Sequence, residues 1–427
     1  MPAAEPTPPL FSEDEIKELF APVAREAHVA LAVSGGSDSM ALVHLAHRWT
    51  QQHGRAGESV PKLTILTVDH RLRPGSAAEA QTVGEWAKEL ELDQVILPWE
   101  GDKPLSGLQM IARDARYRLM SEWCRTHSVK VLILAHNLDD QAETVLMRLK
   151  RGAGVEGLGG MRPATSRDDI MIFRPLLGMP RARLRAYLGA LGRQWLEDPS
   201  NQDQRFERVR IRKALGEVGV EAAAIALSAK RVRRAFEAVL NAAYAFLDSE
   251  VSQHEEGFGE IALAALLAMS EEIRIRALWS LVRRYGDRGF VEMSEIENLS
   301  KWLDSNAGAA RTLGGCRIAR GKSSLVFGRE AGRISPQPVP VPHSGRLKWD
   351  NRFEIEASGT LTPTAIAPAR LAGKIARQPK LPAFVQASLP AVLVEGRLAA
   401  IPHLGLRTEA APAGLVIRAS FSVEPWF

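Results

Sequence analysis

The strongest constraint on the fold is a regular alternation of short apolar runs and helical patterns between His28 and about Leu134. The apolar runs read VALAVS, KLTILTVDH, DQVILPW and VKVLILAH. Longer stretches with helical spacing separate them: SMALVHLAHRW, SAAEAQTVGEWAKEL and LQMIARDARYRLMSEWCRTH. Strands that alternate with helices predict βαβ units and a buried parallel sheet. We therefore expect an α/β fold, with functional side chains gathered where the strands end.

The composition of the chain changes along its length and predicts several domains. A capping box at Ser12 and Glu15 opens a short helix in an N-terminal extension. After about Arg212 the sequence becomes Ala-rich and helical, and a Pro-rich stretch later separates it from short strand-like pieces around one helix. The predicted parts are the extension 1–27, the α/β domain 28–215, a mainly helical domain 216–330, a linker 331–346 and a small α+β domain 347–427.

Charge and cysteine content narrow the class of protein. The 55 Lys and Arg residues outnumber the 50 Asp and Glu residues, and a pI near 9.3 makes a polyanionic partner plausible. The two cysteines, Cys124 and Cys316, have no metal-type spacing and exclude a disulfide framework. With no signal-peptide pattern and no membrane-spanning apolar run, we expect a cytoplasmic protein without membrane contact. The sequence leaves the oligomeric state open, and a homodimer is one arrangement it allows.

The stretch HVALAVSGGSDSMALVHLA, from His28 to Ala46, predicts a strand, a tight turn and a helix. Glycines let the backbone approach an anion closely, and the amides at the start of a helix attract negative charge. We therefore interpret the phosphate loop, residues Ser34, Gly35, Gly36, Ser37, Asp38 and Ser39, as a nucleotide site. Asp38 suits this place if it holds Mg²⁺ against the phosphates. The alternative is a capped helix start whose glycines serve only the turn.

Two other glycine-containing stretches resemble nucleotide loops without their context. The segment from Gly152 to Gly157 fits GxGxxG but follows a helical pattern instead of a strand. The stretch GCRIARGKSS has Cys316 where a Walker loop needs glycine, and it lies in a predicted hairpin. We expect neither to bind a nucleotide.

The string SGGSDS after a first strand resembles the PP-loop ATP pyrophosphatases, which split ATP between its α- and β-phosphates. Further stretches are similar to the tRNA(Ile)-lysidine synthase series in that family's order: VDHRLRPGSAAEA, ARDARY, AHNLDDQAETVLMRLKRGAGVEGLGGM, RPLL and EDPSNQDQRFERVRIR. The resemblance is dense over the first half of the chain and looser beyond it. It implies that ATP adenylates the wobble cytidine of a tRNA(Ile) with a CAU anticodon. The ε-amine of free L-lysine then displaces AMP to give lysidine.

Carboxylates in HNLDDQAET suit the second substrate. If a helix begins near Asp139, Asp140 and Glu143 lie three apart on one face and can hold one cation, while Asp139 points elsewhere. The resemblance implies that Asp140 and Glu143 recognise the substrate lysine, and His136 is a catalytic candidate at the strand end. The alternative is an acidic helix start that merely suits the helix dipole. Spacing does not identify the general base among Asp140, Glu143, a phosphate oxygen or water.

Basic residues supply candidates for contacts with ATP. Arg113 and Arg116 share a helix face, and the resemblance makes Arg113 a contact for ATP or for the activated base. The alternative is a solvated face paired with Asp114. Asp69 and His70, at the end of the second strand, either contact the nucleotide or cap that strand.

Clustered arginines predict contacts with RNA phosphates. The cluster runs from Arg181, Arg183, Arg185 and Arg193 to Arg205, Arg208, Arg210 and Arg212, and AKRVRR adds Arg231, Arg233 and Arg234. The resemblance places SNQDQRFERVRIR near the anticodon loop, although Val209 stands where many members carry Asn.

Three rival functions remain at this point. A tRNA thiolation enzyme shares the phosphate loop, but such chemistry generally needs a reactive cysteine, and Cys124 and Cys316 look structural. A small-molecule amidating synthetase is disfavoured by the basic stretches and the helical appendage. A non-catalytic tRNA-binding relative is disfavoured by the presence of Asp38, Asp140 and Glu143.

Overall fold

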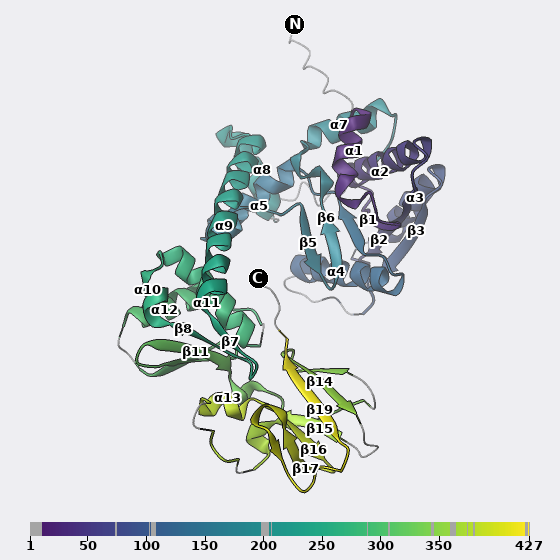
Figure 1. Cartoon of the computed structure of the whole chain (residues 1–427). Coiled ribbons are helices and arrows are strands. Elements are labelled where there is room, and N and C mark those ends of the chain that lie inside the picture. The colour runs from purple at the N-terminus through teal and green to yellow at the C-terminus, as the bar shows by residue number, and fades with distance from the viewer. Residues whose placement is uncertain are drawn as a thin grey trace. The chain divides into compact units, whose positions relative to one another are not determined.

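The computed structural model describes residues 11–72, 75–101, 103, 108–197, 205, 207–287, 289–305, 308–342, 346–358, 364–373, 375–378, 381–422 and 426. The chain forms two compact units, one up to Phe236 and one from Glu237 (Figure 1). Residues 200–204 and 206 of the segment expected near the anticodon lie outside the described residues. Among the described helices, none combines the length and apolar character needed to cross a bilayer.

The first unit is built on a six-stranded sheet in the order β3-β2-β1-β4-β6-β5. The first five of these strands run parallel, and β5 is an antiparallel edge strand beside β6. This confirms the predicted α/β fold with a parallel sheet. The strands are β1 His28–Ala32, β2 Lys62–Asp69, β3 Asp93–Pro98, β4 Val131–Leu134, β5 Ala164–Arg167 and β6 Ile170–Phe173.

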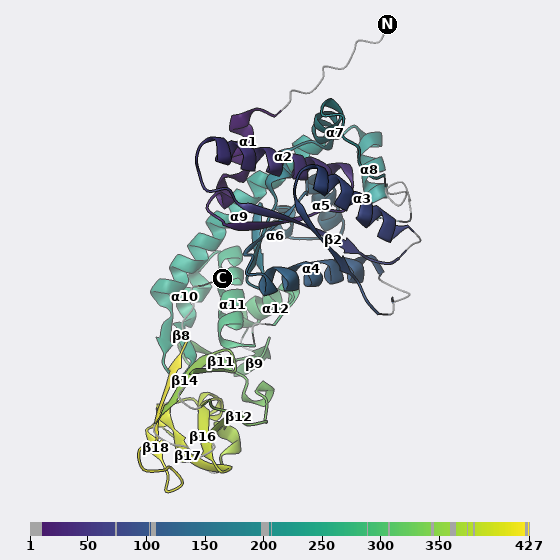
Figure 2. The ribbon, with the colours of Figure 1, turned by 90° about the vertical axis from the view of Figure 1, so that its right-hand side faces the viewer.

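Helices cover both faces of this sheet, and alternate residues of β1 show how. Val29 and Leu31 pack into one core with α1, α2, α3 and α7, whereas Ala30 faces a second core with α4. Figure 2 shows α4 on one side of β2 and α1 and α2 on the other. The helices are α1 Glu13–Phe20, α2 Ser37–Arg55, α3 Ser76–Glu89, α4 Leu108–Thr126, α5 Leu138–Lys150, α6 Val155–Leu158, α7 Arg181–Ala190, α8 Glu207–Val218 and α9 Ala222–Glu250.

The strand order determines where a site can form. From β1 the chain passes to β2 and β3 on one side, and it then returns to β4 on the other side of β1. The segments that leave β1 and β4 at their carboxyl ends therefore diverge. In open α/β sheets such a point of reversal is where ligands bind. The phosphate loop follows β1 and the HNLDDQAET segment follows β4, so both predicted substrate sites meet here.

The second unit contains two further cores. One lies between helices α11 and α12 and the sheet β7-β8-β11-β10-β9, and the other joins the sheets β12-β15-β16-β17-β18 and β13-β14-β19 with α13. The helices are α10 Leu263–Ala268, α11 Glu271–Tyr285, α12 Met293–Asp304 and α13 Ala383–Ala387. The strands are β7 Ser252–His254, β8 Phe258–Ala262, β9 Ala310–Leu313, β10 Cys316–Arg320, β11 Ser324–Arg329, β12 Val339–Pro340, β13 Arg346–Trp349, β14 Phe353–Ser358, β15 Thr364–Pro368, β16 Pro390–Val394, β17 Arg397–Ile401, β18 Leu406–Arg407 and β19 Val416–Phe421.

The domain boundaries predicted at 215/216, 330/331 and 346/347 differ from this division into two units. The unit boundary falls inside α9, so α8 and the first turns of α9 belong with the parallel sheet. The finer division stays a prediction. The two decoy loops have the expected context: GxGxxG links α5 to α6, and GCRIARGKSS forms the β10–β11 hairpin.

Candidate active site

The phosphate loop after β1 has a backbone that requires glycine. Gly35 has a φ of +84°, and a Cβ placed there would come within 2.6 Å of Leu196 Cδ1 and 2.9 Å of Val83 Cγ2. The Leu196 N–H also donates to the Gly35 carbonyl oxygen at 2.9 Å. A side chain at this position would therefore be strained and would push the covering residues away. The tight turn predicted from the sequence has this physical basis.

The start of α2 presents its amides to the loop. Its N-cap is Gly36, which supplies no side-chain acceptor, so the first helical amides remain available to an anion. The Ser39 hydroxyl donates to the Gly36 carbonyl oxygen at 2.9 Å and accepts the Ser34 N–H at 3.3 Å, which closes the loop. This geometry fits the predicted phosphate site.

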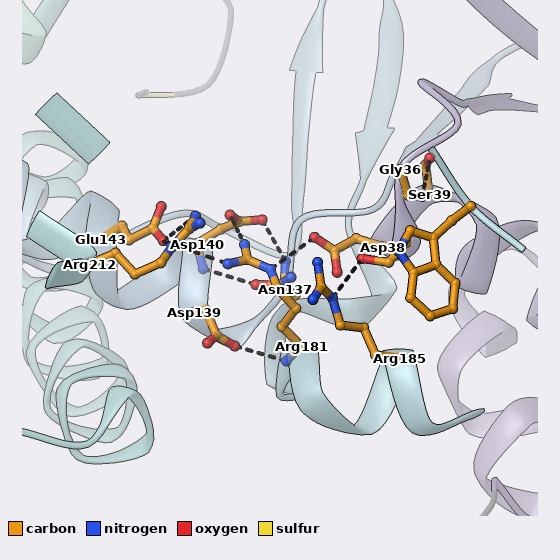
Figure 3. Close-up of polar contacts among 12 residues, drawn as sticks. Gly36, Asp38, Ser39, Asn137, Asp139, Asp140, Glu143, Arg181, Arg185 and Arg212 are labelled. Atoms are coloured by element: carbon orange, nitrogen blue, oxygen red, sulfur yellow. Dashed lines mark hydrogen bonds and ion pairs between the residues drawn. The ribbon is translucent and has the colours of Figure 1, made fainter. Parts of the chain in front are cut away.

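Three carboxylates meet beside the loop and share one arginine (Figure 3). Arg181, the first residue of α7, places Nε 3.2 Å from Asp38 Oδ2 and Nη2 2.9 Å from Asp140 Oδ1. Its Nη1 lies 3.9 Å from Glu143 Oε1. We call Asp38, Asp140 and Glu143 the carboxylate cluster. It joins the phosphate loop to the predicted lysine site.

Local helix chemistry orients this cluster. Helix α5 begins with a capping box in which the Asp140 N–H donates to Asn137 Oδ1 at 2.9 Å and the Asn137 N–H donates to Asp140 Oδ2 at 3.1 Å. Asp139 points elsewhere, as expected, because its Oδ2 accepts the backbone N–H of Arg181 at 2.8 Å. Asp139 thus stabilises the start of α7, and Asp140 keeps one oxygen for a cation.

The charges of the cluster are not balanced. Arg212 of α8 places Nε and Nη2 each 2.8 Å from Glu143 Oε1, so two guanidinium groups face three carboxylates. Among the described residues, Asp38 Oδ1 and Glu143 Oε2 are buried without a hydrogen-bond partner. Burial raises the pKa of both carboxyl groups, and Arg181 on Asp38 and Arg212 on Glu143 offset part of that rise. The cluster therefore has two buried oxygens, one on Asp38 and one on Glu143, that can receive positively charged partners.

A group of arginines lies around His136, just beyond β4. Burial, together with the positive charges of nearby Arg113, Arg174, Arg208 and Arg116, lowers the pKa of His136 to about 3. Its imidazole is consequently neutral near pH 7, and it can accept or donate a hydrogen bond without adding charge. Asp114 pairs with Arg167 at 3.7 Å and not with Arg113 or Arg116. Both arginines are exposed, so the solvated basic face stays open as the alternative for this pair.

Asp69 and His70 have partners of their own. Asp69 Oδ1 accepts the Arg71 N–H at 2.9 Å and the Ser76 hydroxyl at 2.7 Å, which favours the capping role over a nucleotide contact. His70 Nε2 lies 3.1 Å from Arg116 Nη2. Burial lowers the pKa of His70 to about 4.

The arginines of the expected RNA-binding cluster divide into two groups. Arg183 donates to Glu15 at 2.8 Å, Arg193 pairs with Glu89 at 2.5 Å, and Arg181 and Arg212 lie in the carboxylate cluster. Arg233 donates to the Gly159 carbonyl oxygen, so it supports the end of α6. Arg205, Arg210, Arg231 and Arg234 are exposed and Arg208 is half-buried, and these five remain the predicted RNA contacts.

Arg181 was expected among the ligands of RNA phosphates, but its side chain is the internal counter-ion of the carboxylate cluster. Arg181 is 143 residues from Asp38 in sequence, and the run PRARLR alone shows no sign of acidic partners. Asn137 was not singled out either, although its place before an acidic helix start is an N-cap signal.

The loop after the first strand, the sheet reversal beside it and the helix start that faces it define a PP-loop protein. A family model described as "PP-loop domain" matches residues 10–218. Three relatives named tRNA(Ile)-lysidine synthase match most of the chain. The relative from Rhodopseudomonas palustris is 39% identical, and the match covers 79% of this chain and 97% of that protein. The relative from Ruegeria pomeroyi is 36% identical, and the match covers 88% of this chain and 89% of that protein. The one from Wolbachia sp. subsp. Brugia malayi is 33% identical, covering 88% of each chain. The chain belongs to the tRNA(Ile)-lysidine synthase family.

One solved structure has a looser similarity. The "U34-tRNA thiolase NcsA from Methanococcus maripaludis" superposes with a TM-score of 0.45 at 16% identity, over 53% of this chain and 78% of that one. Both cysteines of the present chain are buried, and burial raises the pKa of Cys124 to about 12 and raises that of Cys316 as well. Neither is a reactive thiolate near neutral pH.

Proposed function

We propose that this protein uses ATP to attach free L-lysine to the wobble cytidine of a tRNA(Ile) with a CAU anticodon. In the first step the cytidine O2 attacks the α-phosphorus of ATP and pyrophosphate leaves. In the second step the lysine ε-amine attacks C2, the C2–O2 bond breaks, and AMP leaves with that oxygen. One observation carries the proposal: Arg181 joins the phosphate loop residue Asp38 to Asp140 of the predicted lysine site across 3.2 and 2.9 Å.

The first step needs groups that stabilise negative charge on the phosphates. The amides at the start of α2 and the hydroxyls of Ser34 and Ser37 would supply such groups. The donor set also fits Mg²⁺, because Asp38 Oδ1 is a buried carboxylate oxygen without a partner, and Mg²⁺ typically takes one or two carboxylates plus substrate phosphates. Bound there, Mg²⁺ would offset the charge that develops on the leaving pyrophosphate.

The second step needs a site that binds an ammonium group and takes a proton from it. Asp140 and Glu143 face the same cation in the structure, and Glu143 Oε2 has no hydrogen-bond partner among the described residues. Lysine would add the positive charge that the cluster lacks. The raised pKa of Glu143 makes this carboxylate a better proton acceptor than an exposed one.

The RNA partner is supported by the exposed arginines near this site. Arg208 and Arg210 lie in the N-terminal half of α8, which also carries Arg212 into the carboxylate cluster. A wobble base in a single-stranded loop can be turned out of its stack into a pocket, so it is reachable at the sheet edge. We expect the reaction to take place in the cytoplasm.

The experiment supplies the full chain with ATP, Mg²⁺, labelled lysine and a tRNA(Ile) transcript with a CAU anticodon. The expected result is label on the RNA, with stoichiometric pyrophosphate and AMP. The matched control is a transcript that differs only at the wobble cytidine, which should take no label. If the CAU transcript stays unlabelled while the protein still releases pyrophosphate with another substrate, the lysine assignment is wrong.

A further inference from the structure

Three arginines of α7 follow one another at every second residue but have different partners. Arg181 is neutralised within the carboxylate cluster, and Arg183 donates to Glu15 and lies over the Phe11 ring. Arg185 is four residues after Arg181, on the same face of the helix. Arg181 contacts the phosphate loop at Asp38, whereas Arg185 contacts it at Ser37, and the proposed function gives Arg185 no task.

Arg185 contacts the residue that opens α2. Its Nε donates to Ser37 Oγ at 3.3 Å, and Ser37 is the first helical residue after the Gly36 cap (Figure 3). The other side of the guanidinium donates from Nη2 to Glu197 Oε1 at 3.0 Å. The guanidinium therefore lies between the phosphate loop and a counter-ion on the segment that covers Gly35.

The partnership with Glu197 is weak enough to be exchanged. The side chains of Arg185 and Glu197 are 46% and 60% exposed, and exposed ion pairs contribute little to stability. Glu197 also has a second partner, because Trp195 Nε1 donates to its Oε1 at 2.8 Å. Arg181 differs, since breaking its contacts would leave buried carboxylates unpaired.

We propose that Arg185 binds the pyrophosphate portion of ATP. To do so, it breaks its ion pair with Glu197. The amides at the start of α2 direct the phosphates toward Ser37, and an arginine at Ser37 meets them with two or more donors. A polyanion neutralises the guanidinium better than the single exposed carboxylate of Glu197. Arg185 is then a ligand of the β- and γ-phosphates and of the leaving pyrophosphate, whereas Arg181 orients the carboxylates.

This assignment rests on the proposed use of ATP, but it is tested without RNA or lysine. Calorimetric titration of the full-length protein with Mg·ATP, and separately with Mg·pyrophosphate, measures the two dissociation constants. Arg185→Gln should weaken both by roughly 10- to 100-fold, as expected for lost hydrogen bonds to a charged group. Arg185→Lys, which keeps the charge but not the fork of donors, should fall between that variant and the unchanged protein.

Glu197→Gln gives the sharper result because it should change pyrophosphate affinity in the opposite direction from Arg185→Gln. Removal of the competing carboxylate should tighten pyrophosphate binding, by roughly 2- to 5-fold. If the ion pair served only to hold the segment over Gly35, both variants would break the same contact and both would weaken binding. Equal weakening in Arg185→Gln and Glu197→Gln would therefore overturn the proposal.

Arg193→Gln is the matched control. Arg193 forms a comparably exposed pair with Glu89, with side chains 40% and 53% exposed, and should bind both ligands as the unchanged protein does. Pyrophosphate that binds Arg185→Gln as tightly as the control would also refute the assignment. Failure of lysine transfer would contradict the proposed function but would not change these titrations. The titrations alone test whether Arg185 binds pyrophosphate, so the two proposals can fail independently.

Discussion

Replacement of Arg181 by methionine tests whether this residue is the counter-ion of the carboxylate cluster. The change removes one guanidinium from among Asp38, Asp140 and Glu143 and leaves Arg212 as the remaining cation on them. Methionine has a similar length, so the loss of packing is small compared with the loss of charge.

The magnitude follows from the distances. At about 3 Å and an effective dielectric constant of about 20, one ion contact is worth about 5 kcal/mol before the cost of desolvation. The side chain of Arg181 is 17% exposed and that of Glu143 is 1% exposed, so the penalty for breaking a buried pair applies. We expect the free energy of unfolding to fall by about 3–5 kcal/mol at pH 8, or by roughly 10 °C in Tm.

The loss should depend on pH with a definite sign. Burial already raises the pKa of Asp38 and Glu143, and without the guanidinium that opposes this rise both pKa values move further above those of the unfolded chain. The folded variant then binds more protons than the unfolded variant, so its stability increases as the pH falls. The difference in Tm from the unchanged protein should therefore be largest at pH 8 and shrink toward pH 5. Mg²⁺ should also stabilise the variant more than the unchanged protein.

The measurement is thermal unfolding at pH 8, 7, 6 and 5, with and without Mg²⁺. Arg193→Gln, which breaks an exposed pair, should change Tm little at any of these pH values. If Arg181→Met does not fold, Arg181→Lys retains one charge and should show the same trends at smaller amplitude. A Tm difference that is constant across the pH range would mean that Arg181 stabilises the fold by packing alone.

Two further predictions concern the loop and the core. Asp38→Ala should reduce adenylation, measured as pyrophosphate release, by roughly 100-fold or more, because it removes the charge that holds the cation. RNA binding, measured by gel shift, should be largely retained because Asp38 is not an RNA contact. Equal loss in the two assays would indicate a structural role. Burial of His44 in α2 lowers its pKa from 6.5, the value expected in the unfolded chain, to about 4 in the folded protein. Between pH 6.5 and pH 4, His44 is therefore protonated in the unfolded chain but not in the folded protein. Stability should fall by up to about 3 kcal/mol as the pH drops from 6.5 to 4, and His44→Gln should flatten that slope in Tm; an unchanged slope would refute the assignment.

Local patterns predicted the parallel sheet and the phosphate loop because short-range physics determines them. Gly35 is needed where φ is positive, and the spacing of Asp140 and Glu143 follows from the helical repeat. Such features depend on neighbours within a few residues, so the sequence displays them directly.

The partners of the arginines could not be predicted because they depend on which elements meet. Arg181 and Arg183 look alike in PRARLR, but one faces a carboxylate cluster whose Asp38 lies 143 residues earlier in sequence, and the other pairs with Glu15. Arg212 looks like an RNA ligand and instead contacts Glu143. Charge clusters in a sequence show that counter-ions are needed, whereas only the packed helices show whether these come from the protein or from a partner.

The hydrogen bond from Leu196 to Gly35 has a consequence for how the protein is made. The phosphate loop lies near the N-terminus, but about 160 residues must follow it before the residue that covers it has been synthesised. At typical synthesis rates of about 5–20 residues per second, that takes roughly 10–30 s. A nascent or truncated chain that ends before Trp195 has the whole glycine motif but lacks Leu196, which packs over Gly35. Such a chain should bind ATP poorly. The nucleotide site is therefore completed late in synthesis, close to the time at which the arginines of α8 emerge.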